Sequence, residues 1–228
     1  LDPTWVPFCR ELWSSAEQQQ NYLPGVPEGS DLCITPVSAP ENHYVPIKAD
    51  NRLEADGTLR GTFTLTAEGQ SDSNIRRIFT TGFQSEWKST MERQLLAISP
   101  KARLLSVDYG KNPKDYQAAP IKITFRYEIP DYALKGEGEM FFRPMVMNNL
   151  YNQVRSYMWI DTSVENRKYG FKDACSRLVE LDETVQLPAG YKLVSAVKDE
   201  TMQGVGADFE GSLVQKGNKV LLHNRLAL

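Results

Sequence analysis

The segment 44-YVPIKADNRLEADGTLRGTFTLTAE-68 decides the fold of this chain, because it predicts two strands joined by a tight turn. Apolar and polar residues alternate from Thr58 to Glu68, which is the pattern of a strand with one buried face. The preceding segment, Tyr44 to Glu54, is its expected partner. Asp56-Gly57 between them supplies the positive φ that a tight hairpin requires. We therefore expect an antiparallel hairpin here.

Further strands are predicted downstream of this hairpin. Residues Ile121 to Ile129 alternate without interruption, and Pro130 then ends the strand because proline cannot donate in a ladder. Short strands separated by turn residues follow: Glu137–Arg143, Val179–Leu187, Tyr191–Val197, Asp208–Val214 and Lys219–Leu228. This spacing is typical of a sandwich or a barrel. The predicted fold class is mainly β, an antiparallel β-sandwich.

One helical insertion is predicted at about residues 73–98. Asp72 or Ser73 is the expected N-cap of its first part, Gly82 interrupts it, and Ser85 can cap the second part. The second part carries one apolar stripe at helical spacing, formed by Trp87, Met91, Leu95 and Ile98. We expect this stripe to pack on a face or edge of the sheet, although a partner-binding groove would use the same pattern.

Composition limits the classes of partner. Of the 228 residues, 24% are charged, and the formal net charge of −3 comes with scattered Lys and Arg, so no nucleic-acid partner is expected. No apolar run approaches the roughly 20 residues of a membrane helix, so a membrane-spanning protein is not expected. Three cysteines without a CxxC pair argue against a metal ribbon or a disulfide framework, although a single disulfide bond remains an alternative. No phosphate loop or metal-ligand cluster is found, so no cofactor and no metal are expected.

Residues 1–40 differ from the rest because they are rich in proline, glycine and polar residues. Only Leu32 to Thr35 resembles a strand. This segment also holds four large aromatic residues, Trp5, Phe8, Trp13 and Tyr22. We interpret them as anchors of a long connection against a neighbouring domain, and a binding platform is the alternative.

The same segment carries a family resemblance. The run from Leu1-Asp2-Pro3-Thr4 to Leu23-Pro24-Gly25 resembles the end of the catalytic core in bacterial transglutaminase-like proteins. The resemblance implies that Asp2 is the acid of a papain-like Cys-His-Asp triad, in which the acid orients the histidine. Because the cysteine and histidine precede the acid in that family, both partners are absent from this chain.

Residues 41–228 are similar to the β-rich accessory region that accompanies such cores. The resemblance thus divides the chain into the tail of a core with its connector, residues 1–40, and an accessory β-sandwich, residues 41–228. It implies a periplasmic, cell-surface or secreted location and a parent thiol hydrolase or acyltransferase, such as a cysteine protease or amidase. The upstream core would be the main partner.

Two other kinds of site are weighed from the residues. An independent Cys-His site would draw on Cys9, Cys33, Cys175, His43 and His223, but none of them has a recognisable local signature. Cys33 and Cys175 instead read as small buried residues, and Asp2 alone reads as a turn residue before proline. The carboxylate pairs Glu137 with Glu139 and Asp182 with Glu183 are expected on the solvated surface.

The functional expectation is a non-catalytic accessory domain that positions or stabilises a transglutaminase-like core. The alternative is a binding module for a cell-envelope glycan or protein, using exposed aromatics such as Tyr151 or Trp159. These lie in the stretch Met145 to Ile160, which is either a ligand-gripping loop or the filling of an irregular part of the core. A purely structural domain is the third possibility.

Overall fold

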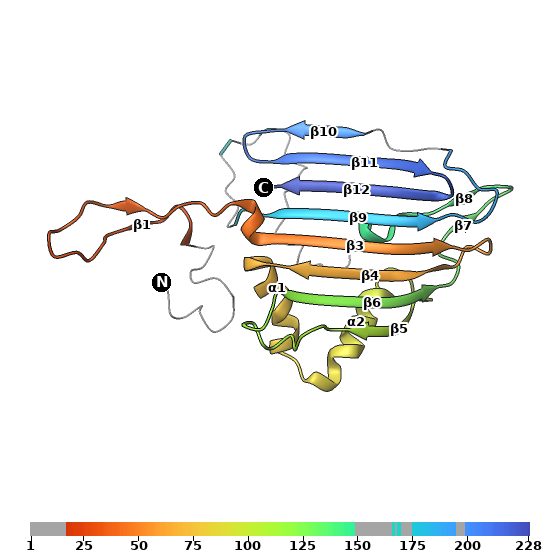
Figure 1. The fold of residues 1–228 in the computed structure, drawn as a ribbon, viewed down its shortest axis with the longest axis horizontal. Coiled ribbons are helices and arrows are strands. Elements are labelled where there is room, and N and C mark those ends of the chain that lie inside the picture. Colours follow the sequence, from red (N-terminus) through yellow and green to blue (C-terminus); the bar gives the residue numbers. More distant parts are fainter. Residues whose placement is uncertain (1–16, 149–165, 167, 170–174, 195–198) are drawn as a thin grey trace.

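A computed structural model describes residues 17–148, 166, 168–169, 175–194 and 199–228. Their main feature is one open sheet of eight strands, shown in Figure 1. Its strands, in spatial order, are β10 (Glu200–Gln203), β11 (Asp208–Lys216), β12 (Lys219–Ala227), β9 (Leu178–Gln186), β3 (Tyr44–Leu53), β4 (Leu59–Ala67), β6 (Ile121–Ile129) and β5 (Arg103–Asp108). The mainly β fold class is confirmed.

The hairpin expected at residues 44–68 is confirmed as β3 and β4. The strands pair antiparallel from Ile47 opposite Leu65 to Leu53 opposite Leu59. In the turn, Gly57 has φ of 90° and the Asp56 carboxylate accepts the Thr58 N–H at 2.9 Å. The glycine supplies the positive φ that this connection requires. The prediction for residues 121–129 is likewise confirmed by β6, which pairs with β4 along its whole length.

The sheet is mixed, which the sequence did not indicate. β3 pairs parallel with β9, while all other neighbours in the eight-stranded sheet are antiparallel. This contact joins strands that are more than a hundred residues apart, so alternation within either strand cannot reveal it. The expected purely antiparallel order is therefore wrong at this one junction.

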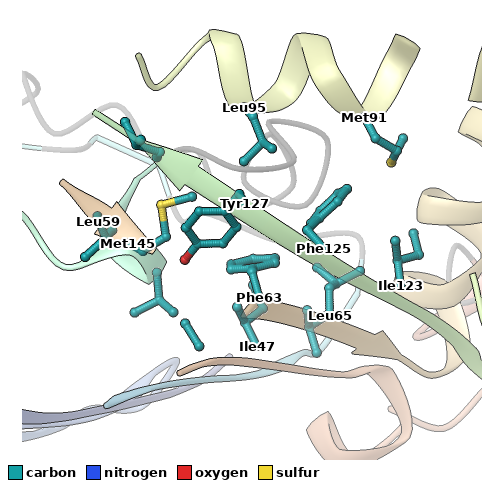
Figure 2. Packing of buried hydrophobic residues seen from close by; sticks show 14 of the residues in the cluster. Ile47, Leu59, Phe63, Leu65, Met91, Leu95, Ile123, Phe125, Tyr127 and Met145 are labelled. Carbon is teal, nitrogen blue, oxygen red and sulfur yellow. The ribbon is translucent and has the colours of Figure 1, made fainter. Parts of the chain in front are cut away.

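Two α-helices, α1 (Gly69–Thr80) and α2 (Trp87–Leu96), form the expected helical insertion, with a short 3-10 turn, η4 (Gln84–Glu86), before α2. They lie at the β4, β6 and β5 end of the sheet in Figure 1. In Figure 2, Met91 and Leu95 point from α2 toward Phe125 and Tyr127 of β6. Met91, Leu95, Phe125 and Tyr127 are all buried. The stripe predicted in α2 is therefore core.

These helices explain why no second large sheet is needed. In the part of the chain that the structure describes, the apolar face of the sheet packs against α1, α2 and irregular segments, and the remaining strands form two pairs only. These pairs are β1 (Asn21–Tyr22) with β2 (Cys33–Ile34), and β7 (Leu134–Lys135) with β8 (Met140–Phe141). The expected sandwich is corrected to one sheet covered by helices and loops.

Several predicted boundaries also change. The strand expected at Glu137–Arg143 is reduced to β8, and the one expected at Tyr191–Val197 is not formed over 191–194. β5 and β10 were not predicted. Two short 3-10 turns, η3 (Pro40–His43) and η5 (Met145–Met147), precede β3 and follow β8. No helix in the described ranges is long and apolar enough to cross a membrane.

The N-cap predicted for the first helix is also corrected. α1 begins at Gly69, so Asp72 lies inside the helix. The buried His43 ring replaces a local cap, because its Nδ1 accepts the N–H of Gln70 at 3.1 Å. Asp72 instead points inward, where it pairs with Arg76 at 2.5 Å and accepts the Ile121 N–H at 2.6 Å.

Candidate functional site

A large groove lies at the end of the sheet where β3 and β9 finish, and we call it the end groove. Its volume is about 760 Å³, within the range of small-molecule and peptide sites. It is lined by Leu53, by residues 138–142 around β8, and by residues 187–194 after β9. Three aromatic rings, of Phe141, Phe142 and Tyr191, lie among these residues. The end groove is therefore the candidate site.

The first wall of the end groove, residues 138–142, continues into a tightly held segment. Behind it, the Tyr132 hydroxyl donates to the Arg143 carbonyl at 2.6 Å. The N–H of Val146, in η5, donates to the Glu183 carboxylate at 3.0 Å. Both Met145 and Val146 are buried, so the start of the stretch Met145 to Ile160 fills core, while residues 149–160 lie outside the described residues.

The second wall, residues 187–194, is tied to the β11–β12 hairpin. The Leu187 N–H donates to the Asn218 carbonyl at 2.8 Å, and the Leu193 N–H donates to the Gln215 side-chain oxygen at 2.7 Å. Tyr191 and Leu193 pack against the core, while Lys192 and Val194 are exposed. The second wall and the segment that follows the first wall are thus held by hydrogen bonds from neighbouring elements, which is what a preformed site needs.

A buried polar network behind the first wall is built around Glu183. Its carboxylate accepts the Asn51 amide at 2.7 Å, and the Tyr127 hydroxyl donates to the Asn51 oxygen at 2.6 Å. Burial raises the pKa of Glu183, and the hydrogen bonds from Val146, Met145 and Asn51 oppose this shift. Burial also raises the pKa of Tyr127, with the Glu183 charge adding to it. A carboxylate in this setting anchors backbone, and nothing in the network faces solvent.

Glu183 corrects the expectation that the Asp182-Glu183 pair is solvated, since its exposed fraction is 2%. The signal was present in the sequence. Alternation along β9 places Glu183 on the same face as Val179 and Val185, which are buried. Asp182, by contrast, is half exposed, and Glu137 and Glu139 are exposed as predicted.

The open face of the sheet holds the second candidate, a polar row across three strands. The His223 Nδ1 lies 2.7 Å from the Asp182 carboxylate, and Ser212 is the β11 residue opposite His223. A carboxylate, an imidazole and a hydroxyl in sequence are the ingredients of nucleophilic catalysis. However, the side chains of His223 and Asp182 are 40% and 39% exposed, and no hydrogen bond between Ser212 and His223 occurs in the described chain. Exposed pairs of this kind contribute little and read as solvated surface.

Of the remaining predicted site residues, the structure describes His43, Cys33 and Cys175. Asp2 and Cys9 lie outside the described residues, as do Trp5, Phe8, Trp13, Tyr151 and Trp159. Cys175 is buried and its thiol donates to the Ser176 carbonyl at 3.0 Å, whereas Cys33 is only half buried. Burial, aided by the charge of Arg177, lowers the pKa of His43 to about 4. Across the described ranges, no three His, Cys, Asp or Glu side chains are grouped to hold a metal.

Comparisons with models of known families, with curated proteins and with solved structures found no match for this chain.

Proposed function

We propose that this chain is a non-catalytic binding domain that serves a larger thiol enzyme of the transglutaminase-like class, and that the end groove is its binding site. The preformed end groove is the observation that carries the proposal. Its walls are mostly apolar, three rings line it, and polar anchors outside the groove hold the second wall and the segment that follows the first. A site of this design binds without using energy to order its own loops.

Two side chains capable of thiol chemistry, His43 and Cys175, have structural roles in the described chain, which favours a binding role. The His43 ring accepts the N–H of Gln70 at the start of α1, and burial lowers its pKa so that the ring is neutral at pH 7. Cys175 is buried, and its thiol donates to the Ser176 carbonyl. The link to a thiol enzyme rests on the resemblance of residues 1–25. The same resemblance is the basis for proposing a periplasmic or cell-surface location.

The proposal is tested with a version of the chain extended upstream of Leu1 to include the proposed core. A cysteine-directed activity probe should label this protein, and Asp2→Ala should abolish the labelling because the acid orients the catalytic histidine. Phe141→Ala should leave probe labelling intact but lower kcat/KM for a long peptide substrate about tenfold. Phe83→Ala is the matched control, because Phe83 is also an exposed ring, at 76%, but lies between the helices.

Three outcomes would overturn parts of this function. Labelling that survives Asp2→Ala removes the thiol-enzyme assignment. Equal effects of Phe141→Ala and Phe83→Ala on the long substrate remove the role of the end groove. Turnover of a peptide amide by the 228-residue chain alone would contradict the non-catalytic assignment.

A further inference from the structure

The side chains that line the end groove indicate whether a binding domain of this type would bind a glycan or a peptide. Its charged side chains are one acid, Glu139, and one base, Lys192. The rest of its side-chain lining is mainly apolar: Leu53, Met140, Phe141, Phe142, Leu187, Pro188, Ala189, Tyr191, Leu193 and Val194. A glycan presents many hydroxyl groups, and this lining offers few polar side chains to pair with them. A neutral chain with apolar side groups matches the lining better.

Part of each wall shows a strand-like alternation of side chains. In the first wall, Met140 and Phe142 pack toward the core while Phe141, between them, is 61% exposed. In the second wall, Tyr191 and Leu193 pack toward the core while Lys192 and Val194 are exposed. This alternation with a period of two is that of β-strands. Residues 140–142 and 191–194 therefore share the side-chain alternation of a strand, and a turn at 188–191, with Gly190 at φ of 84°, precedes the second of these segments.

Among the described residues, the strand in the first wall, β8, has β7 as its single partner. β8 pairs with β7 through Leu134 opposite Phe141 and Lys135 opposite Met140. The end groove is lined by residues 138–142 and not by Leu134 or Lys135 of β7. In the described residues, no backbone hydrogen bond joins 138–142 to 188–194. An extended peptide added beside β8 would supply the missing ladder.

We propose that the end groove binds an extended, uncharged peptide segment by strand addition to β8, with alternate apolar side chains packed against Phe141, Phe142 and Tyr191. This inference rests on the proposed binding function and names its ligand class. Main-chain hydrogen bonds to β8 provide affinity, and the rings select apolar side chains at every second position. The balanced charges of Glu139 and Lys192 favour a segment without net charge.

The test uses the 228-residue chain and a fluorescein-labelled hexapeptide of alternating valine and threonine with blocked ends, followed by fluorescence anisotropy. We expect saturable binding that Phe141→Ala weakens at least tenfold and that Phe83→Ala leaves unchanged. Two further peptides carry N-methyl groups on alternate residues, one set for each edge of the strand. Strand addition uses one edge, so one methylated peptide should lose binding at least tenfold and the other should retain it.

The outcomes separate this inference from the function on which it rests. Equal loss or equal retention by the two methylated peptides would overturn strand addition, even if Phe141→Ala weakens binding. Soluble peptidoglycan fragments serve as the second ligand. If these fragments bind in a Phe141-dependent way and the hexapeptide does not, the binding function stands and the peptide assignment fails. If neither ligand binds, both fail.

Discussion

The two halves of the sheet differ in how their apolar face is covered. In the half formed by β3, β4, β6 and β5, α1 and α2 lie over residues such as Phe125 and Leu65, which have no exposed surface. In the half formed by β9, β12, β11 and β10, residues such as Leu213 and Leu222 are only partly buried, and loops border them. The first half resembles a finished core, whereas the second leaves space at its end for a ligand.

The polar groups of the two halves differ in the same way. In the helix-covered half, the buried Asp72-Arg76 pair holds the segment before β6, because Arg76 also donates to the carbonyls of Pro113, Asp115 and Ala119. In the other half, Glu183 holds the segment that follows the first wall of the end groove, and Gln215 holds the second wall. One set of anchors therefore stabilises the fold, and the other positions a binding site. Substitutions should separate these roles.

The largest loss in the free energy of unfolding is expected from Asp72→Ala in the helix-covered half. The substitution leaves the Arg76 guanidinium buried without its carboxylate and removes the acceptor of the Ile121 N–H. Breaking a buried pair on one side costs about 3–5 kcal/mol in the free energy of unfolding. Urea unfolding measures it. Glu92→Ala is the control, because its pair with Lys88 is exposed and spans 4.0 Å, so the change should stay within about 0.5 kcal/mol. A loss below about 1 kcal/mol for Asp72→Ala would contradict this role.

Protonation of His43 at low pH is expected to lower the free energy of unfolding by about 3 kcal/mol. The pKa of this ring is about 4 in the folded protein and 6.5 in the unfolded chain, so between these values the unfolded state binds more protons. The stability is complete above pH 6.5 and is lost as the pH falls toward 4. His43→Asn keeps an acceptor for the Gln70 N–H but does not titrate in this range. Urea unfolding across pH 4 to 7 should therefore show a flatter profile for the variant, and parallel profiles would rule out His43 as the cause.

Local elements of the fold were largely predictable because their patterns are continuous in sequence. The β3–β4 hairpin, β6, the position of the helices and the β11–β12 hairpin follow from alternation, helical spacing and turn glycines. The parallel contact between β3 and β9 was not predictable, since it depends on which distant strands become neighbours. It was also not predictable that the described residues would form no second large sheet. The apolar stripe of a helix and the apolar face of a strand can cover a sheet equally well, and local patterns do not say which of them does so.

The candidate site was harder to predict than the fold. Its walls are short extended segments around Phe141 and Leu193 that come together only through the sheet. The sequence placed a strand at 137–143 but gave no reason to join it to residues 187–194. Glu183 could have been found, because it interrupts an apolar strand face, whereas the pairing of Asp182 with His223 depends on a register between β9 and β12 that no local pattern provides.

The smallest of these losses is expected from Glu183→Ala, which tests the anchor of the groove wall. Without the carboxylate, the Val146 N–H and the Asn51 amide lose their acceptor inside the protein, which costs about 1–3 kcal/mol. Asp182→Ala is a closely matched control, because it removes a carboxylate from the neighbouring residue on the open face and should cost within about 0.5 kcal/mol. Urea unfolding gives both values.

Binding of the labelled hexapeptide sharpens this last comparison. Glu183→Ala should weaken peptide binding even at urea-free conditions where the variant is fully folded, because the segment that follows the first wall is no longer held at Val146. Asp182→Ala should leave binding unchanged. If Glu183→Ala lowers stability but binds the peptide as tightly as the unsubstituted chain, the network around Glu183 belongs to the core alone, and the two halves of the sheet do not divide stability from binding.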